Sequence, residues 1–175
     1  FNCRVIPNRG SWLDFEYDVK DFLYFKIDRK KKIFSSTLLL ALGYTKSEIV
    51  DEFYESEQYN FDAKTEKWKT KFNPENYKAK NFSEEVIDAK TGEVVIKLGD
   101  KINFLSAKKL ANDGLKDILV SRESLFGKFL HRDVKVNEEE DGVFKIGTEL
   151  NDTIIQQILD ANIHSLQISV TNSIN

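Results

Sequence analysis

The sequence is poor in the residues from which covalent and metal cross-links are built. Its 175 residues include one cysteine, Cys3, and two histidines, His131 and His164. A single cysteine forms no internal disulfide, and a site made of four thiolates is excluded as well. Neither histidine has a companion His or Cys at ligand spacing, so no metal site is predicted. A chain of this length buries enough apolar surface to fold without such cross-links.

Signals for membrane insertion and export are also missing. No apolar run approaches the roughly 18 residues that a transmembrane helix needs. The N-terminus has no basic start followed by an apolar stretch, which a secretory signal would have. We therefore expect a cytoplasmic protein without membrane contact. Because there is no methionine, even at position 1, we interpret the chain as a piece from inside a longer protein.

The sequence offers no assembled active site. There is no nucleophile elbow, no phosphate-binding glycine loop and no cluster of aspartates that would hold catalytic magnesium. We predict no catalytic residue, no metal ligand and no cofactor site in this chain. The formal net charge of -3 also gives no global field that would attract nucleic acid, so any such contact must come from a local patch.

The first 56 residues are predicted to form a β-hairpin and two short helices. Leu13–Tyr17 alternates apolar and acidic residues, which is the period of a half-buried strand, and Phe22–Asp28 follows after a turn. Ser35–Thr37 is typical of the N-cap of a helix. Thr45 and Glu48 have the spacing of a capping box, which predicts a second helix directly after the first.

Residues 57–175 are predicted to form a second domain that contains an internal repeat. Lys97–Gly99 recurs as Lys145–Gly147, an offset of 48 residues, and the apolar positions that follow match at the same offset. Two copies, at about 86–133 and 134–175, are each predicted to form a strand, a glycine turn, a helix and a strand. A duplicated unit of this kind is a packing solution and indicates no chemistry by itself.

Local signals also predict where the two repeated helices begin and end. Ser106 is expected to cap the first helix, and Asn151 or Asp152 the second. Gly114 and Asn162 are expected to end them, because both residue types tolerate the left-handed conformation of a helix C-terminus.

Two features of the first domain are candidates for function. The basic run Lys26–Lys32 contains five cations and one anion, and it is either a solvated strand end or a contact to a phosphate backbone. Trp12 follows Arg9 and a Gly-Ser turn. Its indole either anchors the hairpin or offers a platform on which an unpaired base stacks. Arg9 would then add a contact to a phosphate or to a guanine edge.

Three segments of the first domain resemble a known family, in the same order and at the same spacing. Residues 6–18 (IPNRGSWLDFEYD) are similar to the IPYRGSWLDFEFD stretch of the β subunit of bacterial DNA-directed RNA polymerase. Residues 25–32 (FKIDRKKK) and 37–44 (TLLLALGY) resemble the VRIDRKRK and TxLLRALGY segments of that subunit. There are departures, notably Asn8 in place of a tyrosine and Leu40 in place of an arginine.

The resemblance implies an α+β fold made of two parts. Residues 1–56 would be a partial lobe, with the hairpin and two short helices. Residues 57–175 would be the lineage-specific insert, or external domain, built from the duplicated strand-helix-strand unit and offering a protein-interaction surface.

The resemblance also implies DNA contacts. In the family, the tryptophan that matches Trp12 faces the non-template strand and can stack on an unpaired base. The residues matching Asp28, Arg29, Lys30 and Lys32 lie along the downstream DNA channel. With Arg9, these are the expected DNA-binding residues.

The resemblance further implies partners. These would be DNA, the β′, α and ω subunits, sigma factor and an accessory transcription factor on the insert. The assembled enzyme is a nucleotidyltransferase whose magnesium is held by β′, so the isolated chain is expected to be non-catalytic. The alternative is a stand-alone protein-protein interaction module that makes no DNA contact.

Overall fold

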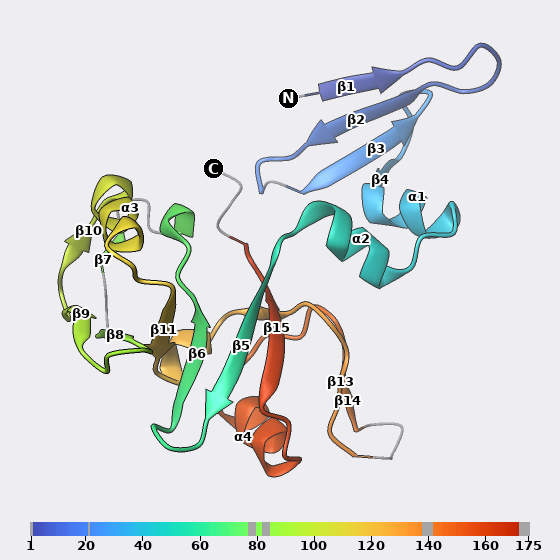
Figure 1. The fold of residues 1–175 in the computed structure, drawn as a ribbon. Coiled ribbons are helices and arrows are strands. Elements are labelled where there is room, and N and C mark those ends of the chain that lie inside the picture. Colours follow the sequence, from blue (N-terminus) through green and yellow to red (C-terminus); the bar gives the residue numbers. More distant parts are fainter. Residues whose placement is uncertain (1, 21, 77–79, 82–84, 138–141, 172–175) are drawn as a thin grey trace. The chain divides into compact units, whose positions relative to one another are not determined.

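The computed structural model describes residues 2–20, 22–76, 80–81, 85–137 and 142–171 (Figure 1). Contacts divide the chain into two compact units, Phe1–Glu52 and Phe53–Asn175. Four α-helices accompany strands whose pairings, among the described residues, are all antiparallel. The predicted α+β class is therefore confirmed. The predicted domain boundary near residue 56 stays a prediction.

The first unit is a four-stranded antiparallel sheet followed by two helices. The strands are ordered β1-β2-β3-β4 along the sheet, so each neighbour in sequence is a neighbour in space. The hairpin of β2 and β3 confirms the prediction, with Phe15 opposite Phe25 at its centre. The elements are β1 (Asn2–Val5), β2 (Leu13–Tyr17), β3 (Leu23–Ile27), β4 (Lys32–Phe34), α1 (Ser35–Ala41) and α2 (Lys46–Phe53).

The predicted cap of the first helix is wrong, whereas that of the second is confirmed. β4 runs directly into α1, so Phe34 occupies the N-cap without a side-chain hydrogen bond and Ser35 is already helical. At α2, Thr45 N–H donates to the Glu48 carboxylate over 2.7 Å, and Glu48 N–H donates to Thr45 Oγ1 over 3.2 Å. Both bonds satisfy amides at the helix start, as a capping box requires.

The second unit is built on a seven-stranded sheet ordered β12-β15-β5-β6-β11-β8-β9. The hairpin of β5 and β6 lies at its centre, where β11 of the first repeat copy pairs with β6 and β15 of the second copy pairs with β5 (Figure 1). The strands are β5 (Ser56–Asp62), β6 (Lys67–Lys71), β8 (Val86–Asp88), β9 (Val94–Ile96), β11 (Asp117–Val120), β12 (Phe129–Leu130) and β15 (Ser165–Ser169).

Shorter elements complete the second unit. Two small two-stranded sheets pair β7 (Lys80–Asn81) with β10 (Lys101–Ile102), and β13 (Val134–Lys135) with β14 (Val143–Phe144). Single 3-10 turns cover Pro74–Asn76 and Glu123–Leu125. No helix within the described ranges is long and apolar enough to cross a membrane.

The helices of the two predicted repeat copies match in the structure, whereas the bounds of the copies stay a prediction. Helices α3 (Phe104–Asn112) and α4 (Asp152–Asp160) start and end at the same offset of 48 residues. Both begin in the same way, because the side chains of Asn103 and Asn151 accept hydrogen bonds from the amides of Ser106 and Ile154. The prediction that Ser106 caps α3 is therefore wrong, since that residue supplies the capped amide.

The two helices also end alike, at the predicted residues. Gly114 and Asn162 both have a positive φ, 109° and 57°, and each amide donates to a carbonyl three residues earlier. The next residues, Leu115 and Ile163, donate to carbonyls five residues earlier. This pair of bonds is the Schellman motif, and it satisfies carbonyls that the helix leaves unpaired.

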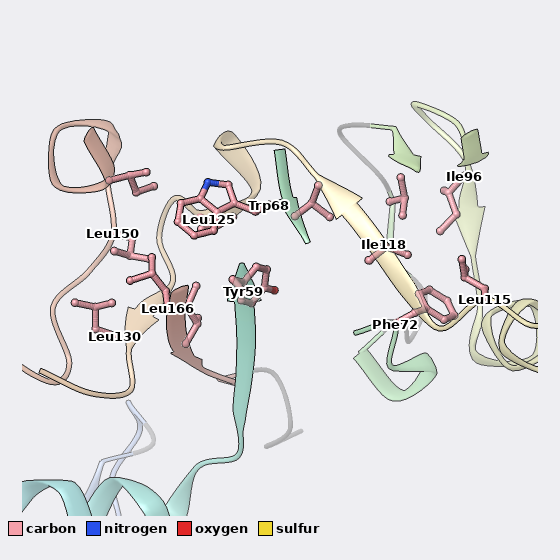
Figure 2. Close-up of a cluster of buried hydrophobic side chains, with 14 of the residues drawn as sticks. Tyr59, Trp68, Phe72, Ile96, Leu115, Ile118, Leu125, Leu130, Leu150 and Leu166 are labelled. Carbon is pink, nitrogen blue, oxygen red and sulfur yellow. The ribbon is translucent and has the colours of Figure 1, made fainter. Parts of the chain in front are cut away.

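The apolar core of the second unit gathers on its central strands. Figure 2 shows Tyr59 of β5, Trp68 of β6, Ile118 of β11 and Leu166 of β15 among these buried side chains. His131 is also buried, at 2% exposed, and its Nδ1 lies 2.9 Å from Ser169 Oγ. This histidine is thus held in the interior by a hydrogen bond.

Candidate nucleic-acid interface

The basic run of the first unit forms a tight turn between β3 and β4. Asp28 and Arg29 both have positive φ values, 48° and 61°, and the Lys30 amide donates to the Ile27 carbonyl over 3.0 Å. Two left-handed central residues match the twist of the flanking strands, as in a type I′ hairpin turn. Aspartate tolerates this conformation better than most residues. The basic run Lys26–Lys32 thus covers the end of β3, this turn and the start of β4, and whether it contacts a phosphate backbone stays a prediction.

Asp28 fastens this turn to the segment that carries Trp12. The Trp12 amide donates to the Asp28 carboxylate over 2.9 Å, and the Asp28 amide donates to the Trp12 carbonyl over 3.0 Å. The bond from the Trp12 amide, followed by one from the Ser11 hydroxyl, holds the pKa of Asp28 below its ordinary value. The carboxylate is ionised at neutral pH and links the main chain of Trp12 to the basic turn.

The Trp12 ring is exposed, and one cation lies over it. Trp12 is 41% exposed, and Arg4 Cζ lies 5.1 Å from the centroid of its ring. Arg4 is itself held by an ion pair with Asp14, whose side chain is 16% exposed. A hydrogen bond to Asp14 is the main reason that the pKa of Arg4 is raised. Trp12 is thus not an anchor sealed within the sheet.

Two cations of the basic run share one anion, and the run also contains cations without an ion-pair partner among the described residues. Lys26 Nζ and Lys32 Nζ both lie near Glu16 Oε1, at 2.9 Å and 3.1 Å. Their hydrogen bonds, that of Lys26 first, hold the pKa of Glu16 below its ordinary value, so one anion offsets part of their charge. Arg29 and Lys31 are exposed and have no ion-pair partner among the described residues.

A groove on this unit is lined by three cations, two of which belong to the basic run. It has a volume of about 420 Å³, and Arg4, Lys26 and Arg29 line it together with Asp14 and Glu16. The nearby ring of Tyr24 carries Lys32 Nζ at 4.9 Å and stacks on Phe34 at a centroid separation of 4.6 Å. Aromatic rings and cations are therefore interleaved on this part of the four-stranded sheet.

The structure brings together most, but not all, of the predicted DNA-binding residues. The Trp12 amide donates to the Asp28 carboxylate, which also interacts electrostatically with Lys30. Arg29 lies between Asp28 and Lys30 in the same turn. Lys32 lies in β4 and pairs with Glu16. Arg9 is exposed in the loop that leads to Trp12. Whether these residues contact DNA stays a prediction.

Sequence reasoning missed Arg4, because nothing in its local sequence marks it. The strand register supplies the signal: Arg4 lies opposite Asp14, and Trp12 precedes Asp14 by two residues. Diagonal neighbours on one face of a sheet lie within reach of long side chains.

Among the described residues, no three His, Cys, Asp or Glu side chains come together as a metal site would require. The expectation that magnesium is held by another subunit stays a prediction.

Comparison with known proteins identifies the family. The model of the family described as RNA polymerase Rpb2, domain 2, matches residues 4–115, which lie in both units. The chain is 40% identical over 172 residues to the DNA-directed RNA polymerase subunit beta of Rickettsia prowazekii (strain Madrid E). The corresponding proteins of Rickettsia felis (strain ATCC VR-1525 / URRWXCal2) and Rickettsia canadensis (strain McKiel) are 40% and 38% identical. Each match covers 98% of this chain and 12% of the relative's length. The chain belongs to the RNA polymerase Rpb2 domain 2 family.

Proposed function

We propose that this chain acts as part of the β subunit of a bacterial DNA-directed RNA polymerase. Its first unit would hold the separated non-template strand and the downstream duplex. Nucleotide transfer would be a property of the assembled enzyme, to which this chain contributes no catalytic residue. The family match and the names of the relatives support this proposal.

The observation that carries the proposal is the link between an exposed indole and a basic turn. Trp12 is 41% exposed, and Asp28 joins it by two hydrogen bonds to the turn bearing Arg29 and Lys30. A base stacked on an aromatic ring contributes about 1–3 kcal/mol. Cations beside the ring then neutralise the phosphates of the same strand.

Other parts of the proposal follow from the parent enzyme. The partners of this chain would be the β′, α and ω subunits and sigma factor. Its catalytic magnesium would be held outside this chain, and its location would be the cytoplasm. None of these depends on the geometry described above.

Binding of the full chain to forked DNA at several salt concentrations tests the DNA contact. Trp12→Ala should weaken binding by about five- to 150-fold, which corresponds to the loss of one stacked base. The slope of affinity against salt should stay unchanged, because the ring carries no charge. Trp12→Phe is the control that keeps an aromatic face. A Trp12→Ala chain that binds forked DNA as tightly as the parent would contradict the stacking role.

Charge variants in the same titration test the basic turn. Arg29→Gln should reduce the salt slope by about 0.7–0.9, the contribution of one neutralised phosphate. Lys32→Gln removes the same charge from a residue already paired with Glu16, so its effect on the slope should be smaller. Equal effects of the two variants would show that the ion pair with Glu16 does not weaken the interaction of Lys32 with DNA phosphates.

A second role, as a protein-interaction module, is favoured by one feature of the second unit. Leu98 and Leu105 are 65% and 75% exposed, more than any other large apolar side chain described in the second unit. An accessory transcription factor that docks on the insert would cover them. If the DNA titrations show no effect of Trp12 or Arg29 while Leu105→Ser weakens assembly with transcription factors, this second role replaces the first.

A further inference from the structure

We propose that Arg4 is a positioning residue for Trp12. Its guanidinium covers one face of the indole, so that a base stacks only on the opposite face. This inference rests on the proposed function and adds the residue that orients the stacking platform.

The backbone of Trp12 is already fixed, but that leaves its ring free to turn. The two hydrogen bonds to Asp28 hold the main chain of Trp12 against the basic turn. A tryptophan side chain still rotates about two bonds, and at 41% exposure the surrounding protein does not enclose it. A contact to the ring itself is therefore needed to hold it in one orientation.

Arg4 supplies that contact from the neighbouring strand. Its Cζ atom lies 5.1 Å from the ring centroid, within the range of a cation-π interaction. β1 and β2 pair with Arg4 opposite Asp14, which places Trp12 diagonally across from Arg4. The planar guanidinium can lie flat against the indole, which a lysine ammonium cannot do.

Arg4 is able to hold the ring because Asp14 holds Arg4. The Asp14 carboxylate accepts a hydrogen bond from Arg4 Nε, and its own side chain is largely buried at 16% exposed. Bonding through Nε orients the plane of the guanidinium. Asp14, Arg4 and Trp12 thus form a chain of contacts that begins in the sheet and ends at an exposed ring.

A ring covered on one face is a one-sided platform. The charge of Arg4 is already matched by Asp14, so Arg4 contributes to binding by holding the Trp12 ring in one orientation. An unordered side chain must be immobilised when a base stacks on it. Immobilising the ring on binding, which would be necessary without Arg4, is expected to lower the affinity by about two- to tenfold.

The test has a first arm without DNA, using acrylamide quenching of tryptophan fluorescence in the full chain. The chain has two tryptophans, and Trp68 is fully buried, so quenching reports Trp12. Arg4→Gln should make Trp12 easier to quench, because both faces become accessible. Arg4→Lys should restore little of the protection, and Lys20→Gln, a matched loss of charge elsewhere in the unit, should leave quenching unchanged. Unchanged quenching in Arg4→Gln overturns the proposal.

The second arm measures binding to single-stranded oligothymidylate over a range of salt concentrations. Arg4→Gln should weaken binding by about two- to tenfold without changing the salt slope, because Arg4 acts through the ring. If the slope instead falls by about 0.7, Arg4 contacts a phosphate directly and the positioning role is wrong.

The two arms separate failure of this inference from failure of the proposed function. If Trp12→Ala binds oligothymidylate as the parent does, the proposed stacking function fails, and so does the role of Arg4 in it. If Trp12→Ala weakens binding but Arg4→Gln changes neither quenching nor affinity, stacking stands and only the positioning role fails. Circular dichroism of each variant confirms that the edge strand β1 remains folded.

Discussion

The two units of the chain differ in how they use their apolar residues. Among the described residues of the first unit, Phe25 is the one large apolar side chain below 9% exposure, whereas the second unit buries a continuous cluster on β5, β6, β11 and β15. The first unit leaves Trp12, Tyr17 and Phe22 about half exposed. The second unit is therefore stabilised by its own core. The first keeps aromatic and charged side chains at its surface, where other molecules can reach them.

Core truncation should give the largest effect and the clearest test of this difference. Ile158 is fully buried in the second unit, and Ile158→Ala should lower the free energy of unfolding by about 2–5 kcal/mol. Ile27 in the first unit is 41% exposed, so Ile27→Ala should cost well under the roughly 1.5 kcal/mol of a fully buried side chain. Urea unfolding followed by the fluorescence of Trp68 measures the first change, and circular dichroism measures both. Equal losses in the free energy of unfolding would contradict the proposed difference in core packing between the two units.

Paired cap variants should give an intermediate effect and test whether the two repeat copies are equivalent. Asn103→Ala and Asn151→Ala each remove the same hydrogen bond at the start of a helix, so each should cost about 0.5–2 kcal/mol. Ser106→Ala is the control, because its side chain does not cap α3. Urea unfolding measures all three. A large loss in Ser106→Ala with none in Asn103→Ala would reverse the assignment.

A pH titration followed at Trp12 of the first unit should give the smallest effect. The pKa of Asp28 is lowered in the folded chain, chiefly by the Trp12 amide. Its stabilising contribution is therefore complete above the ordinary carboxyl pKa and is lost as the pH falls through the lower, folded value. Acrylamide quenching of Trp12 should rise over that acidic range while the buried Trp68 stays protected.

Asp28→Asn is the control for this titration. The amide keeps an acceptor for the Trp12 N–H but does not titrate, so quenching should no longer follow the pH in that range. If the parent and the variant respond alike, another group controls the exposure of Trp12.

Features set by neighbouring residues could be predicted from the sequence. Gly114 and Asn162 end their helices as expected, because the Schellman motif uses residues within one turn. The capping box of Thr45 and Glu48 is equally local. β4 was not predicted because it has three residues, of which Ile33 is the one apolar side chain that is not exposed. Its direct passage into α1 also removed the loop that a cap at Ser35 would require.

The candidate site was predicted in its parts but not in its connections. The motif at residues 6–18 and the basic run indicated the family and the expected DNA-binding residues. The sequence could not show that Lys26 and Lys32 share Glu16, because these residues lie ten and sixteen positions from it. Strand pairing makes them neighbours.

By itself, then, the sequence determined the hairpin of β2 and β3, the duplicated helices with their C-terminal ends, and the resemblance to a polymerase subunit. All three are encoded by residues close together or by repetition along the chain. The tertiary structure decided which cations are offset and which are exposed, and that Arg4 covers one face of Trp12. These depend on the register between strands, which brings together side chains from separate segments of the chain.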